Sequence, residues 1–225
     1  MNMDICRKTI LKTAGAFLFA AVFCVGCYDL GIEPSVPTPT VETFVDGRDG
    51  RTYKKVKIGT QTWMAENLKY AADGSMCHDG AGWGRTPDQT CEEFGRLYDW
   101  QTAMDYVPSS DAVPSGVEGV CPIGWHIPSD AEWTKLTEYV GINGATKLKS
   151  KTFRGGQPGS VKVPDGTDIY NFSALHGPYA SFWWSSTEYE GGNAAWVREI
   201  IANETYVLSW HREKQQFLSV RCLHD

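Results

Sequence analysis

Beyond residue 27, the chain contains none of the short motifs that place metal ligands or catalytic groups at a fixed spacing. After residue 27 it has no C-x-x-C pair, and its five histidines never occur as H-x-x-x-H, which excludes a zinc-type site on spacing. Ser185 and Ser186 lack the G-x-S-x-G context of a hydrolase nucleophile. No set of residues supplies a nucleophile with its base, or a paired acid and base. We therefore expect no catalytic residue, no metal and no cofactor.

Excess positive charge and long hydrophobic runs are also missing. The 21 Lys and Arg residues are outnumbered by 27 Asp and Glu, which gives a formal net charge of −6, and no basic cluster overrides this balance. An acidic surface argues against nucleic acid as a partner. Beyond residue 26, no apolar run approaches the roughly 20 residues that a transmembrane helix needs.

The N-terminal segment has the pattern of an export signal. A positive region with Arg7, Lys8 and Lys12 precedes an apolar run of about a dozen residues, which ends in the string VGC at 25–27. This predicts a lipoprotein signal peptide over 1–26 and a lipid on Cys27, which would anchor the protein to a membrane. Cys24 departs from the usual pattern, and the alternative is an ordinary cleaved signal with a free cysteine nearby. Tyr28 after the lipidation site favours the bacterial outer membrane.

The segment that follows is typical of a linker. Residues 27–45 contain Pro34, Pro37 and Pro39 among small and polar residues, which indicates an extended tether. Turn-forming residues over 46–50 then predict the start of a single domain that spans 46–225.

Four cysteines follow Cys27, and an even number in an exported chain predicts two disulfides. Four cysteines allow three connectivities. We favour Cys77–Cys91, which would close a short Gly-rich loop, and Cys121–Cys222, which would tie the C-terminal region to the middle of the chain.

The hydrophobic patterns predict an α+β domain with an N-terminal hairpin, two short helices, a C-terminal antiparallel sheet and long loops. The clearest local signal is Ser129 with Glu132 three residues later, a capping box that should open a helix ending at Gly141. A second helix is expected over 96–106, and one more helical turn over 145–149. The expected strands are 52–58, 61–68, 182–187, 194–201, 205–211 and 217–223.

Five strings of the chain, in this order and spacing, resemble one family. They are IGTQTWMAENLKY at 58–70, GRLYDWQTAM at 95–104, CPIGWHIPSDAEWTKL at 121–136, FWWSSTE at 182–188 and SVRCLHD at 219–225. Together they are similar to the Fibrobacter succinogenes major paralogous domain, whose members are exported, often lipid-anchored and of unknown molecular function.

The resemblance extends to the C-type lectin-like fold, including formylglycine-generating and sulfatase-modifying enzymes, and implies two helices beside a small sheet with neighbouring termini. Function does not follow from that fold. The Glu-Pro-Asn, Gln-Pro-Asp and Trp-Asn-Asp strings of calcium-dependent lectins are missing here. The copper-binding cysteine pair of the formylglycine-generating enzymes is missing as well, because Cys222 has no second cysteine near it in sequence.

Candidate ligand residues lie in the loops 153–179 and in the region 188–196. Trp83, Trp184 and Trp196 offer flat rings on which sugars stack, although alternation places Trp183 and Trp184 on opposite strand faces, so that at least one should be in the core. Glu188 and Asn193 would supply polar contacts. His126 is expected to be a packed, hydrogen-bonded histidine.

Three classes of function remain open at this stage. The first is a non-catalytic surface module that binds polysaccharide or an envelope protein, and exposed tryptophans would favour it. The second is a structural envelope-assembly lipoprotein, which the burial of every tryptophan would favour. The third is an enzyme such as a hydrolase, which needs a deep pocket with a strongly shifted carboxylate or histidine.

Overall fold

A computed structural model of the chain describes residues 38–80, 84–151, 166–175 and 180–225. The chain divides into two units, Met1–Ser35 and Val36–Asp225, and the fold below is that of the second unit. The predicted leader 1–26, the proposed lipid site Cys27 and the tether as far as residue 37 lie outside the described residues. Within the described ranges, no helix is both long and apolar enough to cross a membrane.

The first sheet, sheet A, combines the N-terminal hairpin with strands from later in the chain. Its order is β1-β2-β3-β10-β5, and all of its pairings are antiparallel. The strands are β1 (Val41–Val45), β2 (Thr52–Ile58), β3 (Gln61–Met64), β5 (Trp125–His126) and β10 (Leu223–His224). The predicted hairpin is confirmed, although its second strand ends four residues earlier than expected.

Strand β1 corrects the predicted boundary of the tether. Val41–Val45 was assigned to the linker, yet it pairs with β2 from Val41 opposite Val56 to Val45 opposite Thr52. The physical reason is visible in its residues, because Val41, Thr43 and Val45 are β-branched and favour a strand. Phe44 between them stacks on Trp125 at a centroid distance of 4.3 Å. The packed domain therefore begins before Asp46.

The second sheet, sheet B, has the order β4-β9-β6-β7-β8. Its strands are β4 (Leu97–Tyr98), β6 (Ala180–Glu188), β7 (Ala194–Ile201), β8 (Leu208–Glu213) and β9 (Leu218–Ser219). The long strands β6, β7 and β8 are antiparallel, and β9 joins β6 through a single parallel pair, Trp183 with Ser219. Among the described residues, strand β8 has a partner on one side only, so it forms an edge of the sheet.

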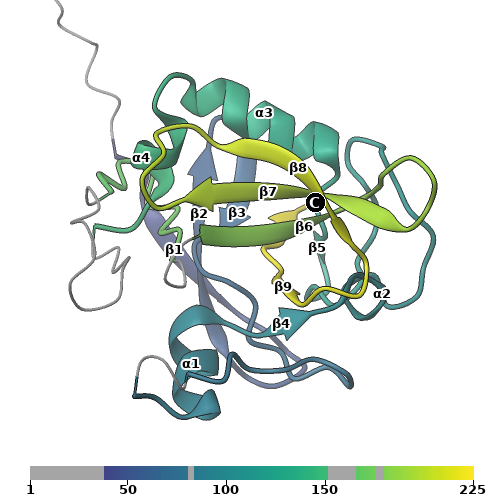
Figure 1. Cartoon of the computed structure of the whole chain (residues 1–225). Coiled ribbons are helices and arrows are strands. Elements are labelled where there is room, and N and C mark those ends of the chain that lie inside the picture. The colour runs from purple at the N-terminus through teal and green to yellow at the C-terminus, as the bar shows by residue number, and fades with distance from the viewer. Residues whose placement is uncertain (1–37, 81–83, 152–165, 176–179) are drawn as a thin grey trace, which may run out of the picture. The chain divides into compact units, whose positions relative to one another are not determined.

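Helix α3 (Asp130–Val140) forms as the sequence predicts. The Ser129 hydroxyl accepts from the Glu132 amide, the Glu132 side chain accepts from the Ser129 amide, and the chain leaves the helix at Gly141 with φ +63°. Trp133, Leu136 and Val140 are buried and form the apolar face of the helix. Figure 1 shows α3 lying beside β7 and β8, and α4 (Gly144–Leu148) follows it.

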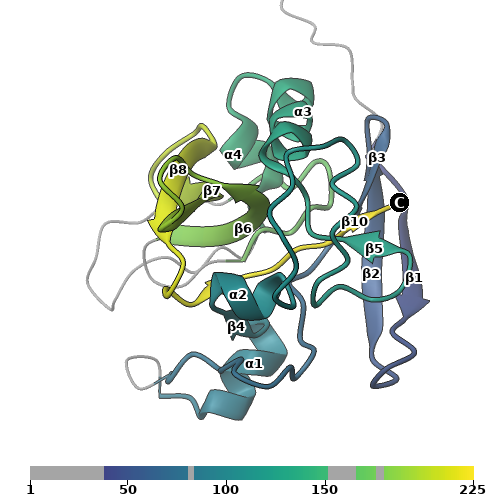
Figure 2. The ribbon, with the colours of Figure 1, turned by 90° about the vertical axis from the view of Figure 1, so that its right-hand side faces the viewer.

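The other two helices differ from expectation. Helix α1 (Pro87–Phe94) lies in a segment predicted to be loop, and a capping box between Thr86 and Gln89 opens it. The helix predicted over 96–106 shrinks to α2 (Trp100–Ala103), because the residues before it form β4 and pair with β9. Figure 2 shows α1 and α2 at the end of the domain opposite α3.

Two clusters of buried side chains hold the sheets together. One gathers Met64, Trp100, Trp125 and Trp184 with the chain around the Cys121–Cys222 bridge, and the other gathers Trp63, Trp133, Phe172 and Trp183 under α3. Both predicted disulfides are present, since the sulfur atoms of Cys77 and Cys91 and those of Cys121 and Cys222 are bonded.

The strand predicted over 217–223 is split, because its ends join different sheets. Strand β9 pairs in sheet B, whereas β10 pairs with β3 and β5 in sheet A. Val220, Arg221 and Cys222 cross between the sheets and are fully buried. The C-terminal region therefore connects both halves of the core.

Candidate functional site

The exposure of the tryptophans separates scaffold from surface. Among the eight tryptophans in the described ranges, six are buried, namely Trp63, Trp100, Trp125, Trp133, Trp183 and Trp184. Trp196 is half-buried and Trp210 is 52 % exposed. Trp83 lies outside the described residues. Indole rings in this domain are thus mainly core material, with one clear exception on β8.

The structure corrects the assignment of Trp184 to ligand binding. Its side chain has no exposed surface, and its Nε1 donates to the Tyr98 carbonyl at 2.8 Å. Alternation does place Trp183 and Trp184 on opposite faces, but both faces of β6 are covered by a core cluster. Neither ring therefore reaches a ligand.

The other three predicted residues lie near one another in sequence but on different surfaces. Glu188 forms an ion pair with Lys214, whose Nζ also lies 4.2 Å above the Trp100 ring. Glu188 is opposite Ala195, so the next residue, Trp196, faces the other side of the sheet. Asn193 is exposed in the turn before β7. The predicted set is thus divided between two faces and a turn.

Trp196 belongs instead to a cluster of four aromatic side chains, which we call the aromatic cluster: Tyr189, Trp196, Trp210 and His211. The rings of Tyr189 and His211 stack with centroids 4.0 Å apart and planes inclined by 13°, and Trp210 lies 5.3 Å from His211 at 12°. Trp196 meets Tyr189 edge-on at 5.1 Å, and it pairs with His211 across β7 and β8. The cluster thus joins β7, β8 and the residue that follows β6.

Sequence reasoning missed Trp210 and His211. Both lie in a strand that the pattern predicted, but alternation within a strand does not tell whether the strand is central or at an edge. The decisive fact is that no described strand pairs with β8 on its outer side. This long-range feature leaves Trp210 half-open to solvent.

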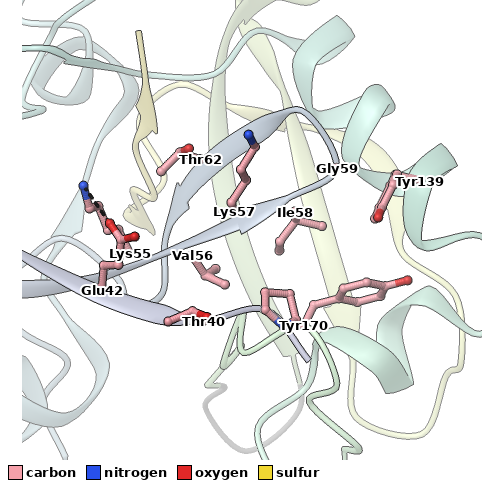
Figure 3. A pocket seen from close by; sticks show the side chains of 11 residues that line it. Thr40, Glu42, Lys55, Val56, Lys57, Ile58, Gly59, Thr62, Tyr139 and Tyr170 are labelled. Carbon is pink, nitrogen blue, oxygen red and sulfur yellow. Dashed lines mark ion pairs between the residues drawn. The ribbon is translucent and has the colours of Figure 1, made fainter. Parts of the chain in front are cut away.

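A groove of about 440 Å³ lies on another part of the domain. We call it the tyrosine groove, and Figure 3 shows Tyr139 and Tyr170 at one end and the ion pair between Lys55 and Glu42 at the other. Its polar wall also carries Thr40, Lys57 and Thr62. The residues come from β1, β2, β3, α3 and the segment 166–175. Tyr170 lies in the predicted ligand region 153–179, whereas no local pattern indicated the others.

His126 is a structural histidine, as predicted. Its Nδ1 lies 2.6 Å from an Asp225 carboxylate oxygen and its Nε2 lies 3.1 Å from Glu132, while the residue is only 2 % exposed. Burial would lower the pKa of His126, but the hydrogen bonds to Glu132 and Asp225 and their negative charges outweigh burial and raise it. Both ring nitrogens are occupied, so neither remains to accept a proton from a substrate.

Metal binding has no evident donor set in the part of the chain that the structure describes. There, no three His, Cys, Asp or Glu side chains gather closely enough to hold an ion. Cys77, Cys91, Cys121 and Cys222 are consumed by the two bridges. The surfaces that the described residues offer are aromatic and polar.

No curated protein and no solved structure is similar enough to the chain to be matched with it. The profile of the Fibrobacter succinogenes major domain matches residues 56–224, which include every described element from β3 to β10. The match covers well over half of the chain and contains both disulfides and the buried 220–222 crossing. The chain therefore belongs to the Fibrobacter succinogenes major domain family.

Proposed function

We propose that the chain is a non-catalytic carbohydrate-binding module with a C-type lectin-like fold, carried by an exported lipoprotein of the bacterial outer membrane. One observation carries the binding role, namely the exposure of Trp210, of which 52 % is open to solvent on the edge strand β8. An indole offers a large flat apolar face with a polar N–H at its edge. The apolar face of a pyranose ring packs on such a surface.

Polar groups for sugar hydroxyls lie on the same strand face as Trp210. Arg212 is two residues further along β8, and Glu199 pairs with Leu208, two residues before Trp210. The Arg212 guanidinium and the Glu199 carboxylate are 3.3 Å apart. Arg212 is the more exposed member of this pair and can donate to a sugar hydroxyl, whereas Glu199 is buried and holds the guanidinium in place. A flat ring on the same strand face as a charged pair suits a sugar, because a sugar has an apolar ring face and hydroxyl groups around its rim.

The aromatic cluster also supports a fixed orientation for the platform. Trp210 packs against His211, which in turn stacks on Tyr189. A ring held by neighbours loses little conformational freedom when a ligand binds, and this lowers the entropic cost of binding. The surface is therefore preorganised for a ring-shaped ligand.

Several features support the C-type lectin-like fold. The hairpin that starts the domain and the strand β10 that ends it belong to one sheet, so the two ends of the domain are neighbours. Helix α3, the three long strands of sheet B and the Cys121–Cys222 bridge fit the arrangement that the motifs implied.

Lipid anchoring rests on the N-terminal pattern alone. Cys27 follows a basic and apolar leader, and Tyr28 after it favours the outer membrane over the inner one. Replacing Cys27 by Ser should release the protein from membranes or leave it unprocessed. Normal processing together with full membrane association of the Cys27→Ser protein would overturn the anchor.

The carbohydrate role is tested with the detergent-solubilised full chain on a glycan array. We expect Trp210→Ala to weaken binding to the recognised glycans at least tenfold, about 1.4 kcal/mol, because a central exposed tryptophan commonly dominates a binding surface. Tyr206→Ala is the matched control, since Tyr206 is an aromatic residue with the same exposure of 52 %. Equal affinity of the Trp210→Ala protein and the control would overturn the proposal.

Two other outcomes favour other classes of function. Absence of glycan binding together with specific capture of an envelope protein at Trp210 would favour a protein-binding module. A structural lipoprotein would also bury most of its tryptophans, as six are buried here. That class would be favoured if cells that lack the protein lose envelope integrity while cells with the Trp210→Ala protein retain it. If the protein turns over glycans, esters or peptides, and replacing a single carboxylate or histidine abolishes this turnover, the protein is an enzyme.

A further inference from the structure

The tyrosine groove differs in chemistry from the aromatic cluster and shares no residue with it. Its volume of about 440 Å³ lies within the range of roughly 300–1,000 Å³ typical of small-ligand sites. The groove combines an aromatic end, formed by Tyr139 and Tyr170, with a basic wall formed by Lys55 and Lys57 (Figure 3).

The charge of the groove is not balanced by its own residues. Nζ of Lys55 is paired with the Glu42 carboxylate at 3.3 Å. Lys57 pairs with Thr62 through the backbone, and its exposed side chain forms no ion pair or hydrogen bond with any residue in the described ranges. The wall therefore presents one uncompensated ammonium group, in a chain whose net charge is −6. An isolated cation beside a groove attracts an anionic ligand group.

The aromatic end is built by close packing. The centroids of the Tyr139 and Tyr170 rings are 5.9 Å apart with planes inclined by 59°. Gly59 permits this arrangement, because a Cβ at this position would lie 2.9 Å from Cδ2 of Tyr139. Tyr139 is 53 % exposed, whereas Tyr170 is buried beneath it. One ring is thus open to a ligand, and the other supports the groove from inside.

The loop that carries Tyr170 is held in an uncommon conformation. Asp168, Asn171 and Ser173 have φ values of +46°, +53° and +52°. The Asp168 carboxylate accepts from the Ser173 amide and hydroxyl, both at 2.8 Å, and the Asn171 side chain donates to the Pro39 carbonyl at 2.8 Å. Non-glycine residues with positive φ values cost free energy, and such residues are common at ligand sites. Here the bonds hold Tyr170 against the start of β1.

We propose that the tyrosine groove binds an acidic polysaccharide, with the carboxylate of a uronic acid unit on Lys57 and the sugar ring against Tyr139. Thr40 and Thr62 supply hydroxyl groups on the polar wall. The inference rests on the proposed carbohydrate-binding function, and it adds a second site and names the charge of its ligand. The groove lies where the chain enters the domain, so the bound polymer would run close to the N-terminal end of β1.

The test uses the full-length protein in detergent, titrated calorimetrically with a uronic acid oligosaccharide and with its carboxyl-reduced neutral counterpart. We expect the acidic oligosaccharide to bind at least tenfold more tightly than the neutral one, and to lose affinity as salt is added. Lys57→Gln should weaken acidic binding about tenfold and remove most of its salt dependence. Lys54→Gln is the matched control, because Lys54 is an exposed lysine on the same strand that does not line the groove. Tyr139→Ala should weaken both ligands.

The outcomes separate this site from the aromatic cluster. Acidic binding that Lys57→Gln reduces and Trp210→Ala leaves intact supports the groove, even if the platform on β8 fails its own test. Acidic binding that only Trp210→Ala reduces overturns the groove and keeps the proposed function. Lys57-dependent binding of oligoglutamate with equal affinity would overturn the assignment to a saccharide. Equal affinity for the acidic and neutral oligosaccharides would overturn the role of charge.

Discussion

The side-chain oxygen of Asn67 accepts hydrogen bonds from Nε and Nη2 of Arg221, at 3.1 Å and 2.7 Å, in the interior of the domain. The same oxygen also accepts from Nε1 of Trp183 at 2.8 Å. The Arg221 guanidinium lies 4.2 Å above the Phe172 ring and donates to the Phe172 carbonyl. Burial lowers the pKa of Arg221 to about 9. A buried cation is thus held by neutral oxygens and aromatic faces.

This arrangement predicts a large loss of stability for Asn67→Ala. The change would leave two guanidinium nitrogens and an indole N–H without their acceptor, and an uncompensated buried charge typically costs about 3–5 kcal/mol. Asn193→Ala, at an exposed turn, is the control and should change the free energy of unfolding by less than about 0.5 kcal/mol. Urea unfolding followed by circular dichroism measures both. A loss below about 1 kcal/mol for Asn67→Ala would contradict the role of this oxygen.

The environment of His126 predicts a pH-dependent stability. Its pKa is raised in the folded state, so its contribution is complete below the unfolded pKa of about 6.5 and is lost as pH rises through the folded pKa. We expect His126→Gln to cost about 2 kcal/mol near pH 5.5, with the difference from the wild type shrinking as pH rises above 6.5. Unfolding free energies measured from pH 5.5 to 9 test this. A difference that stays constant over that range would show that the histidine is not protonated.

The two disulfides should stabilise the domain unequally. Cys121 and Cys222 are 101 residues apart, whereas Cys77 and Cys91 are 14 apart. The chain-entropy account assigns roughly 4.7 kcal/mol to a loop of about 100 residues and about 3 kcal/mol to one of about 15. Replacing both members of each pair by Ser, in separate proteins, should therefore lower the unfolding free energy more for the 121–222 pair. The reverse order would contradict this account.

The contact between Gly59 and Tyr139 gives a fourth prediction, for Gly59→Ala. Gly59 has φ +61°, and an added Cβ would overlap the Tyr139 ring at 2.9 Å, so we expect a loss of about 2–3 kcal/mol and weaker binding in the tyrosine groove. Gly50→Ala is the control, because Gly50 has φ +74° and no atom near its Cβ position. It should cost only the backbone term of about 1–2 kcal/mol. Equal losses in the two proteins would show that the ring moves aside freely.

Local signals in the sequence predicted the local structure well. Ser129 and Glu132 open α3 as expected, and strand β7 has the predicted bounds. The string TPDQ at 86–89 carried an equally good signal for α1, since it combines a capping residue, a proline at the first helical position and a glutamine three residues after the cap. This signal was present and was not used.

The errors arise where distant segments decide the outcome. Leu97 fits the apolar face of a helix, but the pairing of Leu97 with Ser219 makes it part of a strand. Trp184 was predicted to bind a ligand, but core clusters cover both faces of β6 and bury its ring. Trp210 is exposed because no described strand pairs with the outer side of β8. The tyrosine groove combines five separate segments. The periodicity of apolar residues reflects neighbours along the chain, so it does not predict contacts between distant segments.

The place of β10 within sheet A sets the order in which the domain can assemble during synthesis. Strand β10 lies between β3 and β5, and Leu223 pairs with Trp63 on one side and His126 on the other. The facing edges of β3 and β5 therefore have no partner until β10 has been synthesised. A nascent chain that lacks this strand holds the hairpin and β5 as separate pieces with unpaired edges. Completion of the sheet, burial of Arg221 and formation of the Cys121–Cys222 bridge thus all depend on this one C-terminal segment.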